Sequence, residues 1–263
     1  MRFLLNRFGA LLLLMIVLTY FIGNIAVLFG IQIQINFLYY AIVSAFYVYI
    51  LVLVWLDIEH LALFNLDSTT LVLIVIFGIL RSRLDVKYEG YYKGVIFILA
   101  FGILIACLKN WKIIPKTNWR WAAIGILACL SVIPLSLVES LQPEIYTHLN
   151  ITSNNLGLVL IRRSLNEFSF VTIVEETTFR GILWGYLRRS GWKENKIFWV
   201  QAILFWLIHL WQIGNPITFF FTIPINIFIY SLLAHNSKQV FPSIITHSFM
   251  NVVGPILVHY YLM

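Results

Sequence analysis

Long apolar segments alternate with short polar connections along the whole chain. Most of these segments hold about 20 mostly apolar residues, and a helix of that length, rising about 1.5 Å per residue, crosses a hydrocarbon core of roughly 30 Å. The sequence therefore predicts an all-α fold, a polytopic bundle of transmembrane helices. The predicted spans are residues 8–29, 37–56, 68–80, 91–108, 121–141, 165–187, 197–213, 217–234 and 241–262.

The short segment 68–80 decides whether the chain has eight or nine spans, because a helix of its length reaches only about 20 Å. Cytoplasmic loops carry an excess of Lys and Arg. With nine spans and a cytoplasmic N-terminus, eleven Lys and Arg residues lie inside and six outside, whereas eight spans divide them almost evenly. The charges therefore favour nine spans, with the N-terminus in the cytoplasm.

The composition supports a membrane environment, since 61% of the 263 residues are hydrophobic and only 11% are charged. A soluble domain carries about 25% charged residues. The net charge of +7 comes from short basic clusters between the apolar segments, a pattern that reflects topology and not nucleic-acid binding. Cys107 and Cys129 both fall in predicted spans, so they predict neither a disulfide framework nor a cysteine zinc site. We expect an integral membrane protein, in the plasma membrane of a bacterium.

A polar stretch, residues 142–164, divides the chain into two parts. It is the longest stretch polar enough to leave the membrane, and it separates a half with few polar residues from a half rich in them. The sequence predicts N-terminal transmembrane helices over residues 1–141 and a functional part over residues 156–263.

Ionisable residues gather in three spans of the second part, although each costs roughly 2.5–3.5 kcal/mol at the centre of a membrane helix. Span 165–187 carries Glu175, Glu176 and Arg180. The other motif residues are Phe205 and His209 in span 197–213, and His247 and Asn251 in span 241–262. Such a concentration of costly groups predicts a functional site.

Helical spacing gives the two adjacent carboxylates different surroundings. Glu176 and Arg180 are four residues apart and can pair, whereas Glu175 points about 100° away. Neighbouring carboxylates in different settings can hold different pKa values, so Glu175 is the candidate base. A buried structural ion pair explains Glu176 and Arg180 equally well but leaves Glu175 unexplained.

The three motifs lie at similar depths in the nine-span arrangement. Glu175, His209 and His247 fall about 13–20 Å from the same membrane face at 1.5 Å per residue. A single intramembrane histidine is often only a hydrogen-bonding partner between helices. Because three helices share the pattern, we expect these side chains to converge in one cavity.

At these residues the sequence resembles the CPBP family, the CAAX-protease and bacteriocin-processing (Abi) membrane proteins, which include the type II CAAX prenyl endopeptidase. The family motifs are Glu-Glu-x-x-x-Arg, Phe-x-x-x-His and His-x-x-x-Asn, and all three occur here in the family's order on separate predicted spans. The resemblance covers roughly residues 156–263. For the first 140 residues it implies nothing beyond compatibility with additional spans.

The resemblance implies a glutamic-type intramembrane endopeptidase that acts on a membrane-associated peptide or protein. Glu175 and His209 would activate a water, His247 with Asn251 would form the oxyanion site, and Arg180 would hold Glu176. Donors fixed around a developing oxyanion supply several kcal/mol of transition-state stabilisation. No cofactor is required by this mechanism.

Other functions remain open at this point. Glu175, His209 and His247 also form a ligand set that zinc accepts, which keeps a metalloprotease as an alternative. A non-catalytic immunity or scaffold protein of the same family is another, and a transporter would use buried charges as an ion relay. The sequence contains no His-Glu-x-x-His, Gly-x-Ser-x-Gly or Gly-x-Gly-Asp motif, and the substrate is not identified by any feature.

Overall fold

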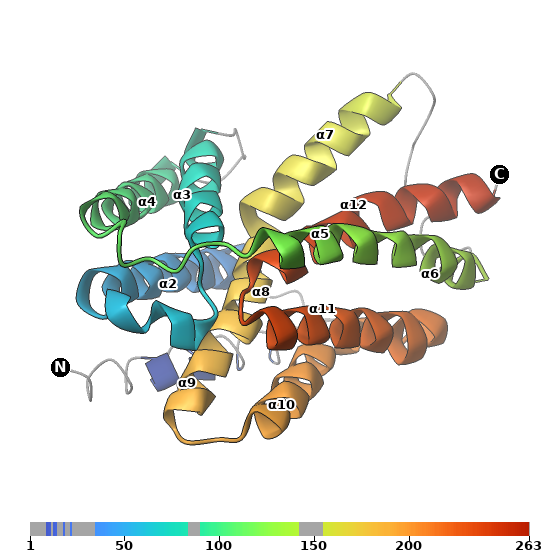
Figure 1. Ribbon diagram of the computed structural model, residues 1–263. Helices are drawn as coiled ribbons and strands as arrows, with labels where there is room; N and C mark the ends of the chain where they lie inside the picture. Colours follow the sequence, from blue (N-terminus) through green and yellow to red (C-terminus); the bar gives the residue numbers. More distant parts are fainter. Residues whose placement is uncertain are drawn as a thin grey trace.

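A computed structural model of the protein describes residues 35–83, 90–141 and 155–262, together with a few positions between 9 and 22. The only regular secondary structure of these residues is helical, with no strand among them, which confirms the all-α prediction (Figure 1). The helices form two groups, and both contact the helical run over residues 156–189, the motif helix, which carries Glu175 and Glu176.

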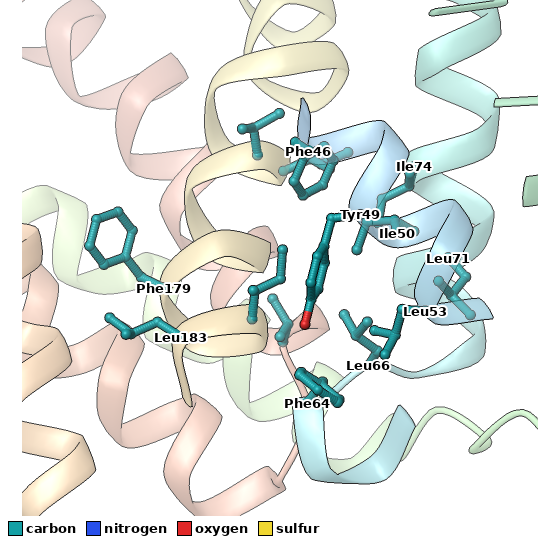
Figure 2. Packing of buried hydrophobic residues seen from close by; sticks show 14 of the residues in the cluster. Phe46, Tyr49, Ile50, Leu53, Phe64, Leu66, Leu71, Ile74, Phe179 and Leu183 are labelled. Atoms are coloured by element: carbon teal, nitrogen blue, oxygen red, sulfur yellow. The ribbon is translucent and has the colours of Figure 1, made fainter. Parts of the chain in front are cut away.

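The first group contains three helices that pack against one another. They are α2 (Ile35–Leu56), α3 (Ser68–Arg83) and α4 (Gly90–Lys109), with the short helix η1 (Ile58–Phe64) between α2 and α3. Side chains of α2, η1 and α3 meet Phe179 and Leu183 of the motif helix in one buried apolar cluster (Figure 2). The first group therefore forms a wall of the core that surrounds the motif helix.

The second group is arranged around α12 (Phe241–Leu262), which contacts α5, α6, α7, α8 and α11. Its other members are α5 (Trp119–Ala128), η2 (Cys129–Ser131), α6 (Val132–Glu139), α10 (Glu194–Leu207), η6 (Leu210–Gln212), η7 (Thr218–Thr222) and α11 (Ile223–Ser237). A β-carbon at Gly125 would lie 2.8 Å from the carbonyl oxygen of Pro242, so α5 approaches the start of α12 as closely as backbone allows. His247 and Asn251 are thus carried by the most enclosed helix of this group.

The motif helix runs without interruption between the two groups. It comprises α7 (Leu156–Asn166), η4 (Glu167–Val171), α8 (Thr172–Glu176), η5 (Thr177–Leu183) and α9 (Trp184–Arg189). Both η4 and η5 are π-helical, and such turns shift the angular position of the side chains that follow and are frequent at functional sites. The two carboxylates of α8 lie between these turns.

The predicted number of eight or nine spans is not confirmed. Among the described residues, four helical stretches are long and apolar enough to cross a membrane: Tyr92–Lys109, Trp119–Glu139, Thr218–Ser237 and Phe241–His259. The pair Ile58–Phe64 and Ser68–Leu80, bent by 98°, adds a fifth if it forms one broken span. Predicted span 8–29 lies largely outside the described residues.

The remaining predicted spans are helical but depart from simple spans for physical reasons. Segment 37–56 lies in α2, of which Ile42–Leu56 is a shorter apolar helix. Segment 165–187 lies in the motif helix and carries four charged residues. Segment 197–213 is cut short because α10 ends at Leu207. Part of the predicted polar connection 142–164 is also helical, since α7 begins at Leu156.

Glu194 ties the end of the motif helix to α10 and to the loop before α12. Its carboxylate accepts hydrogen bonds from Arg188 Nε at 2.6 Å, from Trp184 Nε1 at 3.1 Å and from Lys238 Nζ at 3.1 Å. The hydrogen bonds from Arg188 are the main reason why the pKa of Glu194 falls to about 2. This junction fixes one end of the helices that carry the motifs.

Asn65 joins the first group of helices to the motif helix. It adopts a left-handed conformation with φ of 52° and is fully buried. Its amide Nδ2 donates to the carbonyl of Arg180 at 2.8 Å, its Oδ1 accepts from Arg188 at 3.1 Å, and its own carbonyl accepts from the N–H of Val240 at 2.9 Å. One residue therefore contacts the backbone at Arg180 and the start of α12.

Replacing Asn65 tests this junction. We expect Asn65→Ala to lower the unfolding free energy by about 2 kcal/mol, because it removes two side-chain hydrogen bonds and leaves buried partners unpaired. The measurement is the melting temperature in detergent. Asn110→Ala is the matched control, since Asn110 follows α4 directly and, among the described residues, its side chain bonds only to the carbonyl of Ala106. Equal melting temperatures for both variants would contradict the role of Asn65.

Candidate active site

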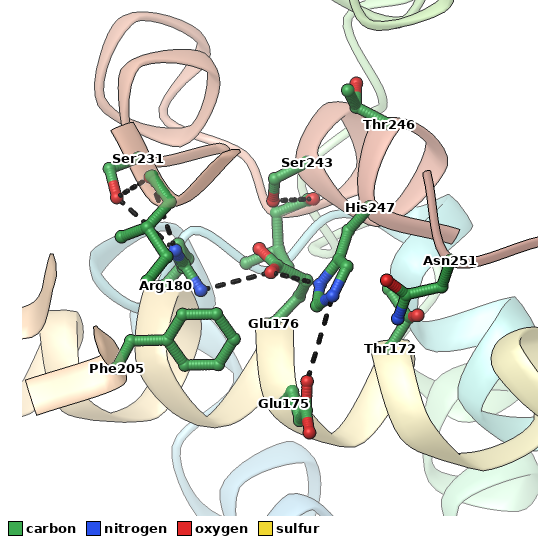
Figure 3. A network of polar contacts seen from close by, with 12 residues as sticks. Thr172, Glu175, Glu176, Arg180, Phe205, Ser231, Ser243, Thr246, His247 and Asn251 are labelled. Atoms are coloured by element: carbon green, nitrogen blue, oxygen red, sulfur yellow. Dashed lines mark hydrogen bonds and ion pairs between the residues drawn. The ribbon is translucent and has the colours of Figure 1, made fainter. Parts of the chain in front are cut away.

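Glu176 is the centre of the polar cluster. Its side chain is fully buried, and its Oε1 accepts hydrogen bonds from Arg180 Nη1 at 3.0 Å and from His247 Nδ1 at 2.8 Å (Figure 3). The ion pair that helical spacing predicts is present. The contact with His247 was not predicted, and it joins the first motif to the third across two helices.

Arg180 is enclosed by groups from α10 and α11. Its guanidinium carbon lies 4.1 Å from the centre of the Phe205 ring, a cation–π contact. Its Nη2 points to Ser231 Oγ at 3.4 Å and to the carbonyl of Ile227 at 3.5 Å, while Gln201 Nε2 donates to the same Ser231 at 2.7 Å. Phe205 therefore holds the arginine as well as preceding His209 in its motif.

His247 lies between the two adjacent carboxylates. Because a carboxylate accepts hydrogen bonds, Nδ1 carries a proton that it donates to Glu176, and Nε2 on the opposite edge lies 3.9 Å from Glu175 Oε2. The Tyr230 ring stacks on the imidazole with centroids 4.6 Å apart and planes 19° apart. The contact with Glu176 occupies Nδ1, so Nε2 is the ring nitrogen that faces Glu175.

The predicted span 197–213 places His209 inside a helix. In the structure α10 ends at Leu207, and His209 lies just beyond its end. Its Nδ1 contacts the carbonyl of Phe205 at 2.7 Å, and since a carbonyl only accepts, Nδ1 carries the proton. Nε2 of the neutral ring is then an acceptor. The rings of His209 and His247 both meet the Phe205 ring edge to face, at 5.0 and 6.0 Å between centroids.

Convergence of the predicted residues is thus direct for some and indirect for others. Glu175, Glu176, Arg180 and His247 are linked by the contacts above. In the part of the chain that the structure describes, no hydrogen bond or ion pair joins His209 to either carboxylate, and its link to the cluster passes through the Phe205 ring.

Asn251 has a partner that the sequence analysis missed. As the spacing implies, it lies one turn after His247 on α12, but its Nδ2 donates to Glu167 Oε2 at 2.9 Å. The same oxygen of this buried carboxylate accepts from Thr172 Oγ1 at 3.0 Å. Glu167 lies within predicted span 165–187, so the cost of ionisable groups in spans was the signal that could have identified it.

The zinc alternative requires three ligands around one point. Among the residues described, no group of three His, Cys, Asp or Glu side chains is arranged to hold a metal ion. A mechanism without a metal stays a prediction, with zinc as the alternative.

The comparison with protein families matches part of the chain and supports, at the level of the family, a peptidase embedded in the membrane. Residues 158–253 match the family described as type II CAAX prenyl endopeptidase Rce1-like. The matched segment contains all seven motif residues, so the resemblance is confirmed for this part of the chain. Neither a curated protein nor a solved structure matches the chain significantly.

Proposed function

We propose that this integral membrane protein is a glutamate-dependent endopeptidase that cleaves a membrane-associated peptide or protein. The observation that carries the proposal is the placement of Glu175 Oε2 opposite His247 Nε2, 3.9 Å away, while Glu176 holds the other edge of the imidazole. One water about 2.8 Å from each atom can bridge such a pair from the side. A base and a polar ring nitrogen then contact the same water.

In the proposed reaction Glu175 takes a proton from the water as the water oxygen attacks the peptide carbonyl carbon. The carbonyl oxygen becomes an oxyanion, and the proton held by Glu175 passes to the leaving amine when the carbon–nitrogen bond breaks. His209, whose Nε2 is an acceptor in the neutral ring, assists in activating the water. Water is the only co-substrate, and the products are a carboxylic acid and an amine.

His247 and Asn251 supply the donors to the oxyanion. A protonated His247 donates through Nε2 while its Nδ1 remains bonded to Glu176. Asn251 uses one amide hydrogen on Glu167 and has a second available. Fixed donors in a poorly hydrated site are worth several kcal/mol of transition-state stabilisation, because they need no reorganisation.

The family supports a peptidase, whereas the substrate, the glutamic mechanism, the bacterial plasma membrane and the cytoplasmic N-terminus are parts of the proposal. A non-catalytic scaffold or immunity protein would use the same buried network only for stability. Separate changes of the two adjacent carboxylates distinguish these functions.

Glu175→Gln should abolish cleavage and leave the fold intact, because glutamine keeps the shape and loses the base. We expect kcat to fall by roughly 100- to 10,000-fold, the contribution of general base catalysis, with an unchanged melting temperature. Glu176→Gln should lower both the activity and the melting temperature. Arg180 loses its charge partner, which lowers the unfolding free energy by about 3–5 kcal/mol.

The measurements are turnover of a fluorogenic peptide selected from a library and melting in detergent. Full turnover by Glu175→Gln would remove the proposed base. If the wild-type protein cleaved no peptide while Glu176→Gln still melted early, the network would be structural and the scaffold function would be favoured.

Chelation of metals should leave cleavage unchanged. His247 Nε2 acts as a donor in the proposed reaction, and a nitrogen that donates a proton cannot ligate a metal at the same time. The test combines metal analysis of the active protein with turnover after chelator treatment. One zinc per chain, with activity lost on its removal and restored by its return, would favour the metalloprotease.

A further inference from the structure

Pro255 interrupts the hydrogen-bond ladder of α12 four residues after Asn251. A proline has no N–H, so the carbonyl of Asn251 has no donor from its own helix. In a membrane helix such a freed carbonyl must be satisfied by another group. Arg163 of α7 supplies this hydrogen-bond donor, because its Nη2 donates to the Asn251 carbonyl oxygen at 2.8 Å.

The same segment also holds the side chain of Asn251. Glu167 follows Arg163 by four residues, and positions four apart lie on one face of a helix. While Arg163 binds the backbone of Asn251, the carboxylate of Glu167 accepts its Nδ2 at 2.9 Å. Thr172 donates to the same carboxylate oxygen and restricts its movement. Arg163 and Glu167, on one helix face, therefore bind both the backbone carbonyl and the side-chain amide of Asn251.

We propose that Arg163 and Glu167 are positioning residues, which act through Asn251 to place its second amide hydrogen at the oxyanion site. This inference rests on the proposed function, because it gives Asn251 a catalytic role. Pro255 contributes to this positioning, because it has no N–H and so leaves the Asn251 carbonyl free for Arg163 to bind. The amide then takes its orientation from α7 and η4 and not from α12 alone.

Arg163→Met in two backgrounds tests the backbone contact. With Pro255 present, we expect kcat to fall roughly 10- to 100-fold with KM unchanged, because misplacement by about 1 Å can cost ~100-fold. In Pro255→Ala the restored N–H satisfies the carbonyl within α12, so adding Arg163→Met should reduce kcat less than threefold. Arg162→Met is the control, since it removes the same charge from the exposed neighbouring position.

Two changes at Glu167 test the side-chain contact. Glu167→Gln keeps an oxygen that can accept from Asn251 and should retain most of the kcat. Glu167→Leu removes the acceptor and should lower kcat as Arg163→Met does. In Asn251→Ala, where no amide remains to be placed, Glu167→Leu should cause no further loss.

Melting temperatures of the same variants separate the possible outcomes. Coupling between Arg163 and Pro255 in both melting temperature and kcat supports the proposal. Coupling in melting temperature alone, or a change confined to KM, overturns it, because the contact would then be structural or would bind substrate. If Glu175→Gln still cleaved the peptide, both the proposed function and the positioning role of Arg163 and Glu167 would be refuted. If Arg163 and Pro255 showed no coupling in kcat, only the positioning role would be refuted.

Discussion

The buried carboxylate of Glu176 is the constraint on which the rest of this structure depends. A carboxylate with no exposed surface inside a membrane protein must be neutralised and hydrogen-bonded, because an unpaired buried charge costs several kcal/mol. Arg180 on the same helix and His247 on α12 meet this requirement through one oxygen atom. Burial of a single charge thereby joins two helices and orients an imidazole toward Glu175.

Each group that satisfies Glu176 needs partners of its own, and α10 and α11 supply them. Arg180 uses the Phe205 ring and Ser231, while the Tyr230 ring stacks on the imidazole of His247. On the side of the first helical group, a β-carbon at Gly185 would lie 2.2 Å from the Phe64 ring, so η1 packs directly on the motif helix. The helices outside the family segment thus support the backbone that carries Glu176 and Arg180.

The sequence predicted the features that follow from composition and helical spacing. The all-α fold followed from long apolar segments, and the contact of Glu176 with Arg180 followed from their four-residue separation. The number of spans did not follow, because the charges of the motif helix and the early end of α10 interrupt simple apolar segments. Glu167 was missed since its contact depends on how two helices cross, which no spacing within one helix reveals.

Glu176 fixes the proton on Nδ1 of His247 and leaves Nε2 facing Glu175. Nitrogen-15 NMR of the histidine rings, in protein reconstituted into lipid, tests it directly, with the resonances of His247 assigned by their loss in His247→Gln. We expect a protonated, strongly hydrogen-bonded Nδ1 whose resonance shifts markedly in Glu176→Gln and little in Glu175→Gln. An unprotonated Nδ1, or a resonance that does not respond to Glu176→Gln, would contradict it.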